Sequence, residues 1–284
     1  DPQPLGTKGI YFDGVDDYVQ TANGLNSSFA VGGSFTVEAW IKPKSLPVSG
    51  QTQTVASKWK RTANSTFKLD ITSDGAIRFQ TGSGQFSTTA TGLITANEWH
   101  HIAAYWDGVN TAVSLFVNGV EVVTADPSIT FINNSTHSIR IGTDVDANDL
   151  PTNVFHGQID EVKIFNTGRT LAQIQADMYS TDSNTPGLTG YWSHDEGTAI
   201  TTNDLVSGTN NGTLINSPLW AHRVTNTTDT DLGSLRAAID SANTDGDKDY
   251  IDFSISGTGV HTISPITGLP IITNPVIIDG YSQA

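Results

Sequence analysis

Short runs of alternating hydrophobic and polar residues, separated by turn residues, fill the chain from Gly9 to Phe165. The clearest example surrounds the Asn118-Gly119 pair. Apolar residues occupy alternate positions of 113–117 before this pair and of 120–122 after it. Asn-Gly is the favoured two-residue turn between two such strands. The pattern therefore predicts an antiparallel β-hairpin.

The segment before the hairpin, 99–106, is aromatic and apolar enough to be covered on both faces, which requires a second packed layer. Regular strand spacing predicts an all-β protein, an antiparallel two-sheet jelly-roll sandwich. One short helix should follow the strands, because Thr170 can cap it and Leu171, Ile174 and Met178 share one face. We expect this helix to seal an edge or an end of the sandwich.

The order of these pieces resembles the laminin G-like, concanavalin A-like lectin/glucanase jelly-roll family. Six segments carry the resemblance: FDGVDDYV from Phe12, FTVEAWIKP from Phe35, EWHHIAAYWDG from Glu98, LFVNGVEV from Leu115, IRIG from Ile139 and GQIDEVKIFNTGRTLAQI from Gly157. The family's fold, two curved antiparallel sheets, agrees with the fold that the strand pattern predicts.

A later segment, 188–220, also resembles this family, although there it usually precedes the FDG strand. Either it pairs into the same sandwich, or it begins a second, incomplete repeat. We favour the first interpretation, since a lone strand cannot bury Leu188, Tyr191 and Trp192. Residues 1–222 are then one laminin G-like domain.

The character of the chain changes after residue 222, with a polar linker, a helix capped by Ser234 and further strand-like runs. This small β-rich segment, 223–284, resembles the opening of right-handed parallel β-helix domains in large secreted bacterial proteins. It is too short to complete a solenoid, which needs several stacked coils and a cap. We expect a truncated start of such a domain, within a longer multidomain chain.

Charge and composition restrict the partners. The net charge is −15 with only 14 basic residues, so no basic cluster exists to bind nucleic acid or an anionic membrane. The chain has no cysteine, and no apolar run approaches the roughly 20 residues of a membrane helix. It begins without a basic leader segment, as after removal of a signal peptide. We expect an extracellular protein, secreted or on a cell surface, with no membrane insertion.

Carboxylates crowd into residues 13–17, and another follows at Asp160 in Gly-Gln-Ile-Asp. Calcium takes about six to eight oxygen ligands, which flexible Gly-containing turns supply. The family resemblance implies a structural calcium held by Asp13, the Gly14 carbonyl and Asp160, with Asp16 as a further ligand. Alternatively, Asp13-Gly14 only makes a turn, and Asp160 pairs with a neighbouring strand.

A second, weaker candidate metal site is the loop containing Asp144, Asp146 and Asn148, whose oxygens occur at every second position. This spacing resembles the first half of a calcium loop, but the central glycine and the bidentate glutamate of an EF-hand are missing. A solvated acidic loop is the favoured alternative.

Two tryptophans near charged residues, Trp59 and Trp106, are candidates for an exposed ring that stacks on a sugar. The more common role for such a residue is to anchor a loop at a strand end. His100 and His101 are adjacent, so on a strand they point to opposite faces and cannot share one metal. We expect both histidines to pack or hydrogen-bond within the sandwich.

Motifs for catalysis are missing. The paired carboxylates of related glycosidases, Glu-x-Asp-x-x-Glu, do not occur, nor do common hydrolase or nucleotide-binding fingerprints. We predict a non-catalytic extracellular binding or adhesion module, stabilised by calcium, with a glycan or a cell-surface protein as ligand. The alternatives are an accessory carbohydrate-binding module of a polysaccharide-degrading enzyme, or a structural spacer.

Overall fold

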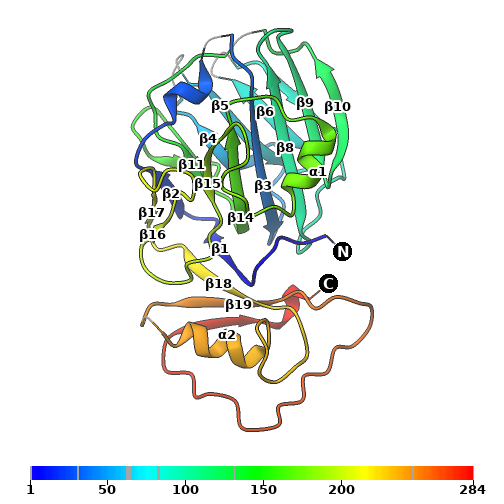
Figure 1. The fold of residues 1–284 in the computed structure, drawn as a ribbon, viewed down its shortest axis with the longest axis vertical. Coiled ribbons are helices and arrows are strands. Elements are labelled where there is room, and N and C mark those ends of the chain that lie inside the picture. Colours follow the sequence, from blue (N-terminus) through cyan, green and yellow to red (C-terminus); the bar gives the residue numbers. More distant parts are fainter. Residues whose placement is uncertain are drawn as a thin grey trace.

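Two large β-sheets packed face to face form most of the protein (Figure 1). The computed structural model describes residues 2–30, 32–61, 65–81, 84–130, 132–244 and 246–283. The strands of the first sheet are β1 (Lys8–Asp13), β3 (Phe35–Pro43), β8 (His100–Asp107), β9 (Ala112–Val117), β10 (Val120–Asp126), β14 (His156–Phe165), β15 (Leu188–Trp192), β18 (Leu219–Val224), β19 (Asp249–Phe253) and β20 (Val276–Asp279).

The second sheet lies across the core from the first. Its strands are β2 (Tyr18–Thr21), β4 (Thr52–Lys58), β5 (Phe67–Thr72), β6 (Ile77–Thr81), β7 (Phe86–Thr88), β11 (Arg140–Ile141), β16 (Thr201–Thr202) and β17 (Gly212–Ile215). A separate short pair consists of β12 (Asp144–Val145) and β13 (Pro151–Thr152). The helices are α1 (Leu171–Asp177) and α2 (Leu235–Ala242), with single 3₁₀ turns at Asn26–Phe29 and Gly280–Ser282.

Strand β14 lies at the centre of the first sheet, whose order is β10-β9-β8-β3-β14-β1-β18-β19-β20. One side of β14 pairs with β3, and the other side is shared by β1, at 156–159, and β15, at 162–165. A bulge separates the two halves, and Glu161 has a positive φ of 51° there. The second sheet has the order β16-β17-β2-β11-β4-β5-β6-β7. The expected jelly-roll sandwich is confirmed.

Aromatic side chains fill the space between the sheets. Phe35 of β3 lies with its ring centroid 5.7 Å from that of Phe67 and 6.1 Å from that of Phe79, both on the second sheet. Ile102 and Leu115 belong to the same buried cluster. Alternation in the strands places these residues on the inner face, as the sequence pattern predicted.

The hairpin of β9 and β10 forms at Asn118-Gly119, where φ is 50° and 70°. Two positive φ values define the turn type that matches strand twist, and they favour Asn and Gly. The preceding strand, β8, is covered on both faces as expected. Its inner residue Ile102 enters the main core, whereas Ala103 packs outward against Phe116 and Ile174.

Helix α1 provides that outer cover. The Thr170 hydroxyl accepts from the Gln173 backbone N–H, and the Gln173 side chain accepts from the Thr170 N–H, which makes a complete capping box. Ile174 is fully buried and Met178 lies against Trp40, while Leu171 is partly exposed. The helix therefore lies over the outer face of the first sheet (Figure 1), and the expectation that it seals an edge or an end is wrong.

Residues 188–220 enter both sheets. Strand β15 pairs antiparallel with β14, β17 pairs with β2, and β18 pairs with β1. The segment therefore completes the same sandwich, as the favoured interpretation of the sequence expected. Burial of Tyr191 and Trp192, both with no exposed surface, gives the physical reason.

The residues after 222 continue the first sheet rather than starting apart from it. Strand β18 spans the expected boundary, and β19 and β20 then add to it in parallel. Helix α2, capped by Ser234, buries Ile239 against Ile251. We call residues 225–283 the C-terminal unit. Both chain ends lie where it meets the sandwich (Figure 1), and Ser254 donates to Gln3. Within the described residues, neither helix is long and apolar enough to cross a membrane.

Candidate functional site

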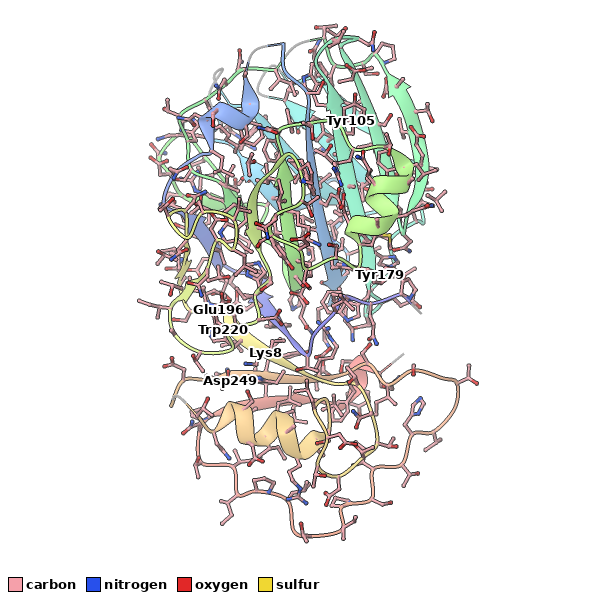
Figure 2. The ribbon with its side chains drawn as sticks, in the orientation of Figure 1. Lys8, Tyr105, Tyr179, Glu196, Trp220 and Asp249 are labelled. Carbon is pink, nitrogen blue, oxygen red and sulfur yellow. The ribbon has the colours of Figure 1, made fainter. Side chains whose placement is uncertain are left out.

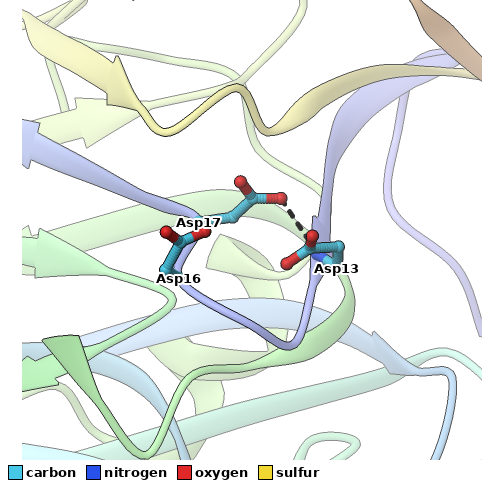
Figure 3. A group of neighbouring side chains, drawn as sticks. All are labelled: Asp13, Asp16 and Asp17. Carbon is cyan, nitrogen blue, oxygen red and sulfur yellow. Dashed lines mark hydrogen bonds between the residues drawn. The ribbon is translucent and has the colours of Figure 1, made fainter.

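Three carboxylates converge in the turn between β1 and β2. One oxygen each of Asp13, Asp16 and Asp17 lies within 4.8 Å of the others (Figure 3). The Asp13 N–H donates to Asp17 Oδ2 at 3.1 Å, and the Val15 N–H donates to Asp13 Oδ1 at 2.8 Å. These local hydrogen bonds fold the turn and orient its acidic side chains. We call Asp13, Asp16 and Asp17 the acidic turn.

Gly14 allows this turn to form. Its φ is +81°, and a Cβ at this position would lie 2.8 Å from the Cβ of His156. Any other residue would meet both backbone strain and a clash. His156 faces Asp13 across the β1–β14 pairing and hydrogen-bonds to Ser45 and Tyr11. Contacts with His156 of the central strand β14 therefore hold the acidic turn in position.

Burial distinguishes Asp17 from the other two acids. Asp13 and Asp16 are exposed, whereas Asp17 is buried. The pKa of Asp17 is raised to about 7, mainly by burial and also by the charges of Asp13 and Asp16, while the hydrogen bond from the Asp13 N–H opposes the shift. A cluster of hard oxygen donors with so little compensating positive charge fits a calcium ion. The crowding of carboxylates in 13–17 was visible in the sequence, but Asp17 was not among the expected ligands.

Asp160 does not belong to this cluster. Strand pairing places His156, not Asp160, opposite Asp13. Asp160 is fully buried and accepts from Arg223 Nη2 at 3.3 Å. Burial raises the pKa of Asp160, and the Arg223 charge opposes that shift. The expectation that Asp160 joins Asp13 around a metal is therefore wrong, and the alternative of a pair with a neighbouring strand describes it.

The second candidate loop directs Asp144 inward and leaves Asn148 exposed. Asp144 is buried and accepts from Lys68 Nζ at 2.9 Å and from Thr152 and Asn153. Asp146 accepts from the backbone N–H groups of Asn148, at 2.8 Å, and of Leu150. Asp144 and Asp146 therefore satisfy separate hydrogen-bond sets, and the loop closes on itself. The favoured solvated acidic loop describes Asn148, which is exposed, but not Asp144, which is 1% exposed.

Neither tryptophan offers a ring to a sugar. Trp106 is 3% exposed and belongs to the core between the sheets. Trp59 is 6% exposed, and Lys68 Nζ lies 5.2 Å from its ring centroid. The expectation that these two rings are exposed is wrong, because both strand ends fold inward. Each tryptophan has the anchoring role that the sequence gave as the more common one.

The two adjacent histidines point to opposite sides of β8, as expected. His100 hydrogen-bonds to Thr95 near the hairpin turn. His101 Nε2 lies 3.3 Å from Glu38 Oε2 beneath α1. Burial lowers the pKa of His101 to about 3. Both histidines belong to the scaffold.

An open groove of about 550 Å³ lies between the two acidic segments. The turn between β1 and β2 contributes one wall through Gly14 and Val15, which lie between the residues of the acidic turn, and the loop after Asp144 contributes another through residues 151–154. Among the residues that the structure describes, its remaining lining comes from the β3–β4 connection, the start of β4 and one basic residue: Ser45, Leu46, Pro47, Val48, Gln51, Thr52, Gln53 and Arg61. We call this the rim groove. The sequence gave no signal for it, because its walls come from four segments far apart in the chain.

Both apolar and polar groups face the rim groove. Val15 and Val48 are largely exposed and give it hydrophobic edges. Arg61 and Gln51 are exposed as well and can donate hydrogen bonds to a ligand. A shallow polar site with a few apolar contacts suits a hydroxyl-rich molecule.

A second, smaller cleft of about 120 Å³ lies where the sandwich meets the C-terminal unit. Its polar groups are largely committed: Lys42 Nζ donates to Asp252 and to two backbone carbonyls, and the Gln283 amide bonds to Ile255. Figure 2 shows Lys8, Glu196, Trp220 and Asp249 gathered at this boundary, while Tyr105 and Tyr179 lie away from it. The cleft is a seam between packed parts, so the rim groove is the better candidate ligand site.

Solved structures share the sandwich. A Bacteroides ovatus protein described as carbohydrate-binding has a TM-score of 0.61 and 22% identity, over 78% of this chain and 61% of its own length. A SAP-like pentraxin from Limulus polyphemus has a TM-score of 0.49 and 16% identity, over 70% of this chain and 92% of that one. The CBM40 of a Ruminococcus gnavus IT-sialidase, bound to α2,3-sialyllactose, has a TM-score of 0.47 and 17% identity, over 62% of this chain and 100% of that one. Only the first is close enough to support the fold.

Sequence comparison identifies the family of the sandwich. No curated protein matched the chain. A family model described as the concanavalin A-like lectin/glucanases superfamily matches residues 13–175. The match excludes residues 223–284, so their resemblance to a β-helix has no support from it. Since the matched part exceeds half of the sequence, the chain belongs to the concanavalin A-like lectin/glucanases superfamily.

Proposed function

We propose that this protein is a non-catalytic, extracellular carbohydrate-binding module whose ligand site is the rim groove. The observation that carries the proposal is the groove itself, an open polar site of about 550 Å³ beside three converging carboxylates. Sugars expose hydroxyl groups on one side and C–H groups on the other. Arg61 and Gln51 suit the first kind of surface, and Val15 and Val48 suit the second.

The comparison with Bacteroides ovatus supports the choice of ligand class. That protein is described as carbohydrate-binding, and this chain spans 61% of its length. At 22% identity the likeness establishes the fold alone, so the ligand is part of our proposal. A net charge of −15 favours a neutral or calcium-bridged glycan over a strongly anionic one.

Calcium has a structural role in this proposal. Asp13, Asp16 and Asp17 hold the ion, which supplies positive charge to carboxylates that otherwise repel one another. The conformation of the turn itself is stabilised by Gly14 and by the hydrogen bond from the Asp13 N–H to Asp17. Since Gly14 and Val15 line the rim groove, a rigid acidic turn fixes one wall of the ligand site.

The buried acids support a non-catalytic role. Glu161 accepts from Tyr191 and lies 3.4 Å from Lys163 Nζ, and Asp160 pairs with Arg223. Glu38 lies with His101 beneath α1. Acid–base catalysis on a sugar needs two carboxyl groups that reach the substrate. These three carboxylates are covered and serve the packing of the outer face, and the exposed Asp13 and Asp16 are the ligands that this proposal assigns to calcium.

A glycan array followed by calorimetry tests the proposal. The wild type should bind a defined glycan in the presence of calcium. Arg61→Ala should weaken that binding by about ten- to a hundredfold, since a hydrogen bond from a charged donor contributes about 1.5–3 kcal/mol. Val48→Asp should also weaken it, by placing a charge on an apolar edge. Lys248→Ala, a change at an exposed residue of the C-terminal unit, should bind like the wild type.

Two results would contradict the proposal. Equal affinity of Arg61→Ala, Val48→Asp and the wild type would place the ligand outside the rim groove. A wild type that binds no glycan would remove the function and leave the spacer alternative, for which the continuous first sheet is the supporting observation. An accessory role in a polysaccharide-degrading enzyme would in turn be indicated by a specific plant or microbial polysaccharide among the bound glycans.

A further inference from the structure

A lysine and two aspartates meet in a closed space beside the short β12–β13 pair. Lys68 and Asp70 lie on β5, and Asp144 lies on β12. Lys68 Nζ is 2.9 Å from Asp144 Oδ2 and 3.5 Å from Asp70 Oδ2, and Asp70 also accepts from Arg78 Nη2 and from Thr54 Oγ1, each at 2.8 Å. The exposed fraction is 6% for the Lys68 side chain, 1% for Asp144 and 0% for Asp70. An amine and a carboxyl group from distant segments are thus held together away from water.

The surroundings of Asp144 resemble a site built for attack on its carboxyl carbon. Thr152 Oγ1 and Asn153 Nδ2 both donate to Asp144 Oδ1, the oxygen that does not contact Lys68, and Asn153 Nδ2 also lies 3.2 Å from Oδ2. The Trp59 ring lies 5.2 Å from Lys68 Nζ and helps to exclude solvent. Two fixed donors at one oxygen and a nucleophile beside the other is the arrangement that stabilises a tetrahedral intermediate in acyl transfer.

We propose that Lys68 and Asp144 form an intramolecular amide bond between Nζ and Cγ, with loss of one water molecule. The Lys68 ammonium gives one proton to Asp144 Oδ2, and the freed nitrogen pair then forms the C–N bond. The carbonyl pair moves onto Oδ1, which Thr152 and Asn153 hold. Asp70 takes a second proton from the nitrogen and passes it to Oδ2, which leaves as water while the carbonyl re-forms.

Proximity makes this condensation feasible without another reactant. Groups held in contact in the right orientation react as if at effective concentrations of about 10⁵ M or more. Lysine amines are established covalent nucleophiles in proteins when they are desolvated. The walls that exclude water also protect the amide product from hydrolysis. No oxidant, metal or cofactor is required, since the ammonium and the carboxylate together contain every atom of the amide and the water.

The cross-link would fasten the rim groove to the second sheet. Thr152 and Asn153 line the groove and also contact Asp144, while Lys68 belongs to β5. A covalent bond between residues 68 and 144 closes a long chain loop, which restricts the unfolded state as a disulfide does. This chain contains no cysteine, so no disulfide can supply such a constraint.

Intact mass of the full chain under denaturing conditions tests the proposal. The wild type should be lighter than its sequence by one water, and a proteolytic digest should yield one branched peptide that joins Lys68 to Asp144. Lys68→Arg should have the full sequence mass. Lys60→Arg is the control, because Lys60 pairs with Asp149 at an exposed site, and it should keep the loss of water.

The result that overturns the proposal is a wild-type chain, folded by circular dichroism, with the full sequence mass and no branched peptide. That result would mean that Lys68 and Asp144 form an ion pair only. The variant Asp70→Asn tests the proton carrier: it should fold, and most of its molecules should have the full sequence mass. If all Asp70→Asn molecules were lighter by one water, the role of Asp70 would be overturned. Should Lys68→Arg fail to fold, the wild-type peptide map still decides. Glycan binding is measured separately, so failure here leaves the proposed function untouched.

Discussion

At the scale of single residues, the acidic turn depends on Asp17. This residue is buried while Asp13 and Asp16 are exposed, and all three point carboxylate oxygens into one small space (Figure 3). A buried carboxylate beside two charged neighbours destabilises the fold unless a proton or a cation compensates it. Metal binding and stability should therefore be linked at this turn.

Calcium should raise the thermal unfolding midpoint of the wild type. At a calcium concentration about one hundred times the dissociation constant, mass action predicts a shift of about 4 °C for a chain of this size. Asp17→Asn should lose most of the shift, because it removes the buried ligand. Asp240→Asn, an exposed acid on α2, should keep it. Scanning calorimetry in EDTA and in calcium measures both, and identical wild-type midpoints would sink the metal proposal.

Buried histidines set the response to acid. Burial lowers the pKa of His101 and of His194 to about 3 from an ordinary 6.5. The unfolded chain therefore binds more protons between pH 6.5 and pH 3, and the free energy of unfolding falls as the pH is lowered through this window. His194→Asn should reduce the loss between pH 7 and about pH 4.5, because asparagine does not titrate. Asparagine also tolerates the positive φ of 55° at this position.

Urea unfolding at the two pH values measures this effect. The matched control is His261→Asn, at a surface position of the C-terminal unit, which should leave the pH dependence unchanged. His194 has one ring nitrogen, Nδ1, in hydrogen-bond contact with Thr202, so part of the neutral-pH stability is also lost in the variant. An identical slope of stability against pH in His194→Asn and the wild type would show that His194 does not titrate in this window.

At the scale of elements, local signals predicted local structure. The Asn118-Gly119 turn and the Thr170 and Ser234 caps depend on residues within a few positions of one another, and all three form. The placement of α1 on the outer face depends instead on which face of β8 the helix has to cover. The alternation of residues in β8 does not predict that face. Asp160 was assigned by family analogy, and its true partner, Arg223, lies 63 residues away. Long-range partners of buried charges leave no periodic signal.

The same limit applies to the ligand site. The sequence indicated both acidic segments, 13–17 and 144–149, because carboxylates at short spacing are visible in one dimension. That the first of these segments and the residues just after the second, 151–154, form two walls of one groove depends on the pairing of β2 with β11 and of β11 with β4. Trp59 and Trp106 show the converse case. Their charged neighbours suggested exposure, but strand ends that fold inward buried both rings.

At the scale of the whole molecule, the C-terminal unit is fastened to the sandwich by more than a linker. Strands β18, β19 and β20 extend the first sheet, and Tyr250 stacks on Tyr11 with ring centroids 4.1 Å apart. Lys42 of β3 donates to Asp252 of β19 at 3.2 Å, and both side chains are buried. A continuous sheet with a buried ion pair across the seam should unfold as one cooperative body.

Lys42→Met tests this coupling. It should cost about 3–5 kcal/mol of unfolding free energy, because it leaves the Asp252 carboxylate buried without its partner. Lys44→Met is the matched control: Lys44 pairs with Asp279 but is partly exposed, so the cost should stay within about 1 kcal/mol. Combining Lys42→Met with Asp252→Leu should recover much of the loss, since an apolar pair carries no uncompensated charge.

Hydrogen exchange followed by mass spectrometry shows where the loss occurs. If the seam couples the two parts, Lys42→Met should speed exchange in β19 and β20 and equally in β1 and β18, because one opening exposes all four strands. Fluorescence and circular dichroism should also report a single coincident transition. Faster exchange confined to residues 249–279, with an unchanged sandwich, would instead mean that the C-terminal unit opens alone. The strands would then form one hydrogen-bonded sheet that does not unfold as one cooperative unit.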